Sequence, residues 1–105
     1  MASFFSRLFG GGSEESESGA ATRGDPVNYE GLVIQAAPER AGDQWRLAGV
    51  IIKPGDDGPL ERSFLRADTF TSRDEAETYA IRKGKQIIDE QGARLFQDGE
   101  PTGRA

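Results

Sequence analysis

The stretch Arg66-Ala-Asp-Thr-Phe-Thr-Ser-Arg-Asp-Glu-Ala76 marks the junction between an extended segment and the one long helix that the sequence predicts. Ser72 followed by Glu75 matches a capping box, in which the serine hydroxyl accepts a bond from an unpaired amide and the glutamate reaches back to the serine. Asp74 and Glu75 also suit the positive end of the helix dipole. The helix is therefore predicted to begin at Ser72.

This helix is predicted to cover residues 72–91 and to end before Gly92, because glycine commonly follows the last helical residue. Gly84 lies inside it, although a glycine in a helix interior costs about 1 kcal/mol relative to alanine. We therefore expect the helix to approach the sheet closely at Gly84, over Trp45. The helix stripe predicted to face the sheet contains Ala76, Ala80, Gly84, Ile87, Ile88 and Gln91.

Three strands are predicted before the helix, over residues 29–37, 44–53 and 60–67. The segments between them are short and rich in proline, glycine and aspartate, which makes consecutive strands antiparallel neighbours. The sequence thus predicts an α+β fold, in which a three-stranded antiparallel sheet is followed by one long C-terminal helix that covers one sheet face.

The middle strand is predicted to be apolar on both faces. One face carries Trp45, Leu47 and Ile51, and the alternate positions carry Ala48, Val50 and Ile52. A single helix covers only one face, and an uncovered apolar face marks an interaction site. Three alternatives could cover this second sheet face: a second copy of the chain, residues 3–9, or a partner protein.

The chain divides into four zones. Residues 1–9 form a short apolar patch, residues 10–26 an acidic linker rich in glycine and serine, residues 27–96 the domain, and residues 97–105 a polar tail. The linker and the tail have too few apolar side chains to offset the entropy of ordering, so both are predicted to be disordered.

The composition argues against an enzyme. The 105 residues include no cysteine and no histidine, which removes disulfides, thiolate chemistry, the commonest general base and the commonest metal ligand. No nucleophile with a neighbouring base can be named. The sequence predicts a cytoplasmic protein that is no enzyme and has neither cofactor nor metal.

Six basic residues are candidates for nucleic-acid binding. Arginines beside an aromatic side chain, together with helix bases, are typical of surfaces that hold phosphates or a single strand. The net charge of −5, with twelve acids against ten bases in residues 27–96, instead favours a solvated surface with salt bridges. The candidates are Arg62, Arg66, Arg73, Arg82, Lys83 and Lys85.

The N-terminal patch consists of Phe4, Phe5, Leu8 and Phe9, which share one side of a short helix. A patch on a flexible tether is typical of docking to a partner groove or to a membrane interface. The third alternative is that the patch packs on the protein's own sheet or is disordered. The membrane is disfavoured, because the stripe is short and only Arg7 would attract anionic lipid.

Several segments resemble the family of HlyU-type transcriptional activators, which are small bacterial proteins. They are the opening stretch 66–76, Arg82-Lys-Gly-Lys-Gln-Ile-Ile-Asp-Glu-Gln-Gly92, Leu95-Phe96, Tyr29-Glu-Gly-Leu, Trp45-Arg-Leu-Ala-Gly, and Phe4-Phe-Ser-Arg-Leu-Phe-Gly10. The resemblance implies a role in regulating transcription and supplies no catalytic or base-reading residue.

A helix-turn-helix, which bacterial regulators commonly use, needs two helices joined by a short turn, whereas this chain is predicted to have one helix after three strands. We therefore predict a non-enzymatic interaction module that acts through an unknown protein partner or a homodimer. Its candidate binding residues are Val50 and Ile52 on the second sheet face and the N-terminal patch. Direct nucleic-acid binding and a peripheral membrane adaptor are the alternatives.

Overall fold

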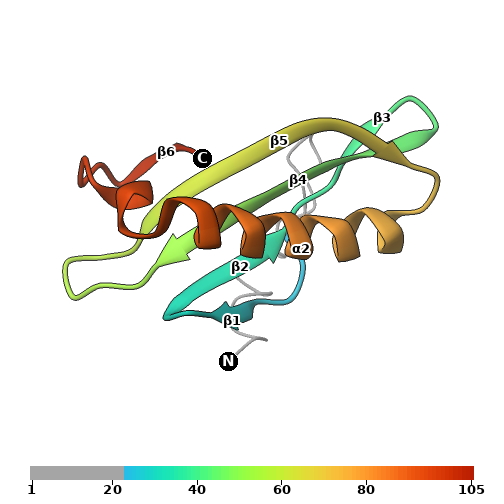
Figure 1. The fold of residues 1–105 in the computed structure, drawn as a ribbon. Coiled ribbons are helices and arrows are strands. Elements are labelled where there is room, and N and C mark those ends of the chain that lie inside the picture. The colour runs from blue at the N-terminus through green and yellow to red at the C-terminus, as the bar shows by residue number, and fades with distance from the viewer. Residues whose placement is uncertain (1–22) are drawn as a thin grey trace, which may run out of the picture.

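The computed structural model describes residues 23–105. One helix lies along one face of a sheet, nearly parallel to its long strands (Figure 1). The described strands are β1 (Val27–Tyr29), β2 (Leu32–Ala36), β3 (Glu39–Ala41), β4 (Gln44–Lys53), β5 (Leu60–Phe70) and β6 (Thr102–Arg104). The helices are α2 (Arg73–Gln91) and the short 3-10 helix η1 (Gly92–Phe96).

The α+β class and the C-terminal helix are confirmed, but the predicted three-stranded antiparallel sheet understates the structure. The sheet has six strands in the order β1-β2-β4-β5-β6, and β3 pairs with β4 beyond the end of β2. Most neighbours are antiparallel, whereas β6 runs parallel to β5, so the sheet is mixed. The predicted middle strand 44–53 is confirmed as β4.

The segment predicted as one strand over residues 29–37 contains the turn of a hairpin, with the last residue of β1 before the turn and β2 after it. Tyr29 pairs with Leu32, and the two residues between them, Glu30 and Gly31, have φ angles of 52° and 79°. Positive φ at both central residues is typical of the tight turn that joins two antiparallel strands. The chain therefore reverses inside the predicted strand, which adds β1 to the sheet.

Strand β5 extends to Phe70 and is irregular near its end. Ala48 pairs with Leu65 but Arg46 pairs with Thr69, so residues 66–68 stand opposite a single residue of β4. Such a bulge twists the strand and interrupts its alternation, which is why the sequence pattern predicted an end at residue 67. Beyond the bulge, the Phe70 ring stacks on Tyr79 of α2 with centroids 5.0 Å apart.

The tail over residues 97–105 differs from the predicted disorder, because it contains strand β6. Glu61 pairs with Thr102 and Ser63 with Arg104, and the Ala105 amide donates to the Ser63 carbonyl at 2.7 Å. Backbone hydrogen bonds to β5 order this strand, together with side-chain bonds from Arg62 to Asp98 and Glu100 and the packing of Ala105 against the core. Composition alone could not reveal these contacts.

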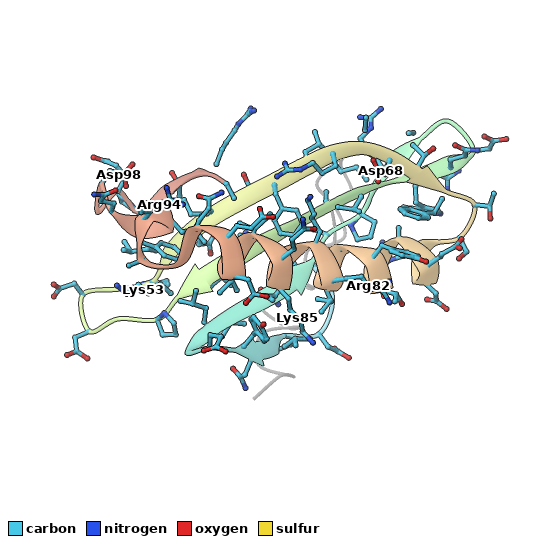
Figure 2. All side chains as sticks on the ribbon, viewed as in Figure 1. Lys53, Asp68, Arg82, Lys85, Arg94 and Asp98 are labelled. Atoms are coloured by element: carbon cyan, nitrogen blue, oxygen red, sulfur yellow. The ribbon has the colours of Figure 1, made fainter. Side chains whose placement is uncertain are left out.

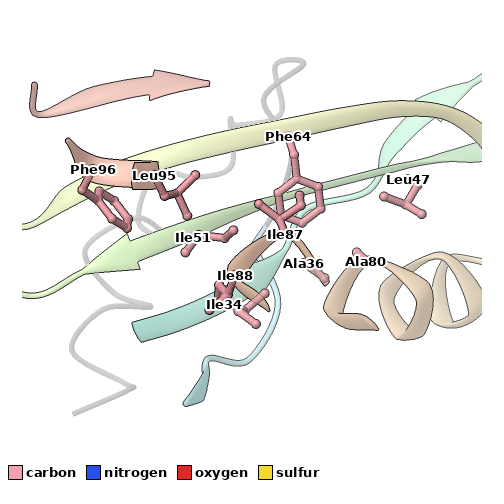
Figure 3. Close-up of a cluster of buried hydrophobic side chains, with 10 residues drawn as sticks. All are labelled: Ile34, Ala36, Leu47, Ile51, Phe64, Ala80, Ile87, Ile88, Leu95 and Phe96. Carbon is pink, nitrogen blue, oxygen red and sulfur yellow. The ribbon is translucent and has the colours of Figure 1, made fainter. Parts of the chain in front are cut away.

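The hydrophobic core lies between α2 and the sheet (Figure 3). The helix residues predicted to face the sheet are buried, apart from Gln91, which is half-buried. The chain after the helix returns over the core through η1, where Leu95 and Phe96 are buried. The core side chains are Ile34, Ala36, Leu47, Ile51, Phe64, Ala80, Ile87, Ile88, Leu95 and Phe96.

Two glycines allow close packing in this core. A Cβ atom at Gly84 would lie 2.7 Å from Cγ2 of Ile34, so the predicted close approach is confirmed, but it occurs over Ile34 of β2 and not over Trp45. A Cβ atom at Gly49 would lie 2.6 Å from Cζ of Phe64. A missing Cβ on β4 therefore makes room for the Phe64 ring.

The helix start is the first test of the local structure. Ser72 is the N-cap, and its Oγ accepts a hydrogen bond from the Glu75 amide at 3.1 Å. We expect Ser72→Ala to lower the free energy of unfolding by about 1 kcal/mol, because this amide loses its partner. Urea unfolding would measure the loss. Ser72→Asp, which keeps an acceptor, is the control, and equal losses in both variants would contradict the capping role.

Candidate functional site

Arg62, the first of the predicted nucleic-acid-binding residues, is buried. It is 2% exposed, and its guanidinium donates to the Leu95 carbonyl at 2.9 Å and the Glu100 carbonyl at 3.0 Å. Its Nη2 also donates to Oδ1 of Asp98 at 2.6 Å, and its guanidinium lies 5.0 Å from the centre of the Phe96 ring. Arg62 thus anchors the C-terminal segment and presents no donor surface to a phosphate.

Arg66 and Arg73 lie on different parts of the junction. Arg66 is in the bulge of β5, where its Nη1 donates to the Leu65 carbonyl at 3.1 Å. Arg73 opens α2, pairs with Glu77 at 2.9 Å, and lies 5.3 Å from the centre of the Trp45 ring. The structure therefore does not place them with Arg62 in one basic patch.

Only the helix bases come together. Arg82, Lys83 and Lys85 lie within about one turn of α2, and Figure 2 labels Arg82 and Lys85 along this helix. The Arg82 guanidinium is 5.0 Å from the centre of the Tyr79 ring, and Lys85 Nζ is 5.5 Å from that of Tyr29. Exposed acids share the helix surface, namely Asp74, Glu75, Asp89 and Glu90.

The second sheet face, opposite α2, carries a groove of about 560 Å³. Ala48 and Val50 of β4 form its buried floor, each 4% exposed. Leu65 of β5 stands at its rim and is 47% exposed. Val50, which was predicted to lie on this face, lines the groove. The other predicted residue, Ile52, follows two residues later on β4, is half-buried and does not line the groove.

Charged side chains border this groove. Arg66 lies beside Leu65, and Arg104 lies on β6 at the end of the chain. Glu39 and Glu61 add negative charge, and Arg23 lies among the lining residues. An apolar floor with a rim of both signs is typical of a protein-binding surface.

Arg23 was assigned to the linker by the sequence, but the structure places it across the second face. Its Nη1 and Nη2 bind both carboxylate oxygens of Glu61 on β5, at 3.2 and 3.0 Å. The next residue, Gly24, donates its amide to the Ala36 carbonyl on β2 at 2.7 Å and accepts from Gln35 at 3.0 Å. No local signal could have found contacts that span 38 residues.

A shallower hollow of about 410 Å³ lies at the far end of α2. Glu30, Leu32, Lys53, Ile88 and Asp89 are among its lining residues. Of its charged side chains, Asp89 already accepts a hydrogen bond from the Tyr29 hydroxyl. We therefore assign it no ligand.

Beside this hollow the Tyr29 hydroxyl donates to Oδ1 of Asp89 at 2.8 Å. This hydrogen bond raises the pKa of Tyr29 above its ordinary value of 10.0, and desolvation and the charges of Asp89 and Glu30 act in the same direction. The bond joins the β1–β2 hairpin to α2. Asp89 is thus bonded to Tyr29 and not to Lys85, four residues earlier on the helix.

The Tyr29 bond predicts a pH dependence. A raised folded pKa means that the bond stabilises the fold fully below the unfolded pKa and is lost as the pH rises through the folded pKa. We expect the wild type to have a higher free energy of unfolding than Tyr29→Phe at pH 8, and we expect this difference to disappear above about pH 10. Urea unfolding from pH 8 to 11 measures it. A stability difference between the wild type and Tyr29→Phe that stays constant from pH 8 to 11 would refute the bond's role.

The N-terminal patch of Phe4, Phe5, Leu8 and Phe9 lies outside the described residues. Within residues 23–105, no three carboxylates gather where they could hold a metal ion. The helices in this part of the chain include none that is long and apolar enough to span a bilayer.

The described fold defines a small α+β domain with one long helix, and residues 23–105 contain no helix-turn-helix. A family model described as "Transcriptional activator HlyU" matches residues 3–96, which is most of the chain. The chain therefore belongs to the HlyU family of transcriptional activators, as the sequence segments indicated. Comparison with curated proteins and with solved structures gives no match.

Proposed function

We propose that this protein regulates transcription in the cytoplasm by binding a protein partner through the groove on its second sheet face. Membership of the HlyU family supports regulation of transcription. The groove supports the choice of a protein, because its floor of Ala48 and Val50 is apolar and Leu65 projects from its rim. That exposed leucine above an apolar floor is the observation that carries the proposal.

The distribution of the basic residues also favours a protein partner. Of the six candidates, Arg62 is buried, and Arg73 is paired with Glu77. Proteins that bind DNA through phosphates present a concentrated basic surface. Among these six candidates, only Arg82, Lys83 and Lys85 lie together, and they share the helix surface with several acids.

A comparison of two matched variants tests the proposal. We expect Leu65→Glu to abolish regulation, because it replaces the exposed apolar side chain at the rim of the groove with a charge. Arg82→Glu with Lys83→Glu should leave regulation intact. Genome-wide transcript levels in cells lacking the protein, complemented with each variant at equal abundance, would measure both effects, with melting curves to confirm folding.

Direct nucleic-acid binding is the second candidate, favoured by the proximity of Arg82, Lys83 and Lys85 on one helix. It predicts the reverse transcript pattern, together with binding to duplex or single-stranded DNA that weakens steeply as salt is raised. Fluorescence anisotropy of the full chain with mixed-sequence DNA would measure this. Tight, salt-sensitive binding that Arg82→Glu with Lys83→Glu removes would overturn the proposal of a protein partner.

A further inference from the structure

The described chain begins beside the groove, because its first residue, Arg23, is among the residues that line it. Gly24 is bonded to the edge of β2 at Ala36, and Arg23 reaches across β4 to Glu61 on β5. The described chain therefore starts at the edge of β2, where Gly24 lies near Glu77 of α2. The Arg23 side chain extends over the second sheet face, where it lines the groove.

The preceding segment has the chemistry that the groove lacks. Phe4, Phe5, Leu8 and Phe9 are four large apolar residues whose spacing predicts one side of a short helix. The groove, about 560 Å³ in volume, offers the apolar floor of Ala48 and Val50. Burial of aromatic side chains on such a floor is favourable because it removes apolar area from water.

The acidic linker is complementary to part of the rim. Glu14, Glu15 and Glu17 lie between the apolar patch and Arg23. Arg66 and Arg104 border the groove. A segment that crosses the groove can bring these opposite charges together.

Linker length does not prevent this docking. Residues 10–22 can span about 45 Å when extended, at roughly 3.5 Å per residue, and the longest extent of the fold is 36 Å. A short tether keeps the local concentration of the patch high, so that even a weak contact is populated. The family match begins at residue 3, so the patch belongs to the same family pattern as the sheet.

From these observations we infer that residues 4–9 of the same chain occupy the groove on the second sheet face. If the groove is also the partner site, as the proposed function holds, the patch competes with the partner and restrains regulation until it is displaced. The occupancy itself does not depend on a partner. Only its regulatory consequence rests on the proposed function.

Spin labelling tests the occupancy in the full chain without any partner. The chain has no cysteine, so Ser3→Cys creates a single labelling site. We expect the label to broaden the amide resonances of Val50, Ser63 and Leu65, and to leave those of Tyr79 and Arg82 on the outer side of α2 sharp. Uniform or absent broadening, or broadening confined to another surface, would overturn the inference.

Two variants make the test specific. Serine at all four apolar positions of the patch should remove the broadening, and a melting curve of this variant would check that the domain stays folded. Leu65→Glu should weaken it by changing the groove, whereas Tyr79→Glu, at the other exposed large apolar residue, should not. Broadening that survives the serine variant would refute the role of the patch.

A mixed sample separates docking within one chain from docking between copies. Isotope-labelled protein without a spin label is mixed with spin-labelled protein without isotope. Sharp groove resonances in the mixture support docking within one chain, and broadened ones overturn it in favour of a second copy. If occupancy is found but Leu65→Glu leaves transcript levels unchanged, the proposed function fails while the occupancy stands.

Discussion

Gly84→Leu is expected to lower the free energy of unfolding by about 3 kcal/mol, the upper part of the range for overpacking a core. The new side chain would start from a Cβ atom 2.7 Å from Cγ2 and 3.2 Å from Cδ1 of Ile34. Ile34 is fully buried, so it cannot rotate away, and α2 would have to lift from β2. Urea unfolding monitored by circular dichroism measures the loss.

Three further variants show whether the contact with Ile34 is the cause. Gln86→Leu adds the same side chain on the exposed side of α2, and we expect a change within about 0.5 kcal/mol. Gly84→Ala should destabilise less than Gly84→Leu, because better helix propensity offsets part of the strain. Combining Gly84→Leu with Ile34→Ala should recover stability relative to the sum of the single changes. An unchanged melting temperature in Gly84→Leu would show that the helix does not pack as described.

Arg62→Leu is expected to cost about 2–3 kcal/mol and to release strand β6. The largest part comes from the Leu95 carbonyl, which is left without its buried donor. The ion pair with Asp98 contributes little to this figure, because the carboxylate is 66% exposed and solvent screens it. Since the same guanidinium holds Glu100 and Asp98, the C-terminal segment loses its attachment to β5.

Hydrogen exchange distinguishes this effect from a general loss of stability. In Arg62→Leu the amides of residues 102–105 should exchange faster than the drop in global stability explains. Arg94→Leu, an arginine-to-leucine change at an exposed position of η1, is the matched control and should leave these amides protected. Slow exchange at Ala105 in Arg62→Leu would contradict the anchoring role. A regulatory defect in this variant therefore says nothing about phosphate contacts.

Elements with local signals were predicted closely. The helix was predicted over residues 72–91 and is observed over Arg73–Gln91 with Ser72 as its cap. Its cap lies three residues from the bonded amide, and its buried stripe repeats with the helix period, so both are visible within a short window. The middle strand was found for the same reason, because apolar residues fill both of its faces.

The missed elements depend on backbone conformation and on pairing. The Glu30–Gly31 turn requires positive φ angles inside a run that also fits one extended strand. The bulge at residues 66–68 changes the register of β5 without interrupting its composition. Strand β6 exists because β5 offers a free edge beside it, which no property of residues 102–104 indicates.

The candidate site divides in the same way. Alternation along β4 placed Val50 on the face away from the helix, where the groove lies. The rim residue Leu65 and the crossing residue Arg23 were missed, because each gains its role from neighbours on other strands. Arg62 was predicted to bind nucleic acid, since the sequence shows its charge but not its burial.

By itself, the sequence determined the α+β class, the helix with its cap and buried stripe, and the two apolar faces of the central strand. These follow from interactions within a few residues or from simple periodicity. Only the tertiary structure decided that β6 pairs with β5, that Arg62 binds the C-terminal segment, and that Arg23 crosses the second face. The reason is that the contacts of Arg62 with Asp98 and of Arg23 with Glu61 join residues 36 and 38 positions apart. The arrangement of the strands brings such pairs together, and no short window of the sequence contains both partners.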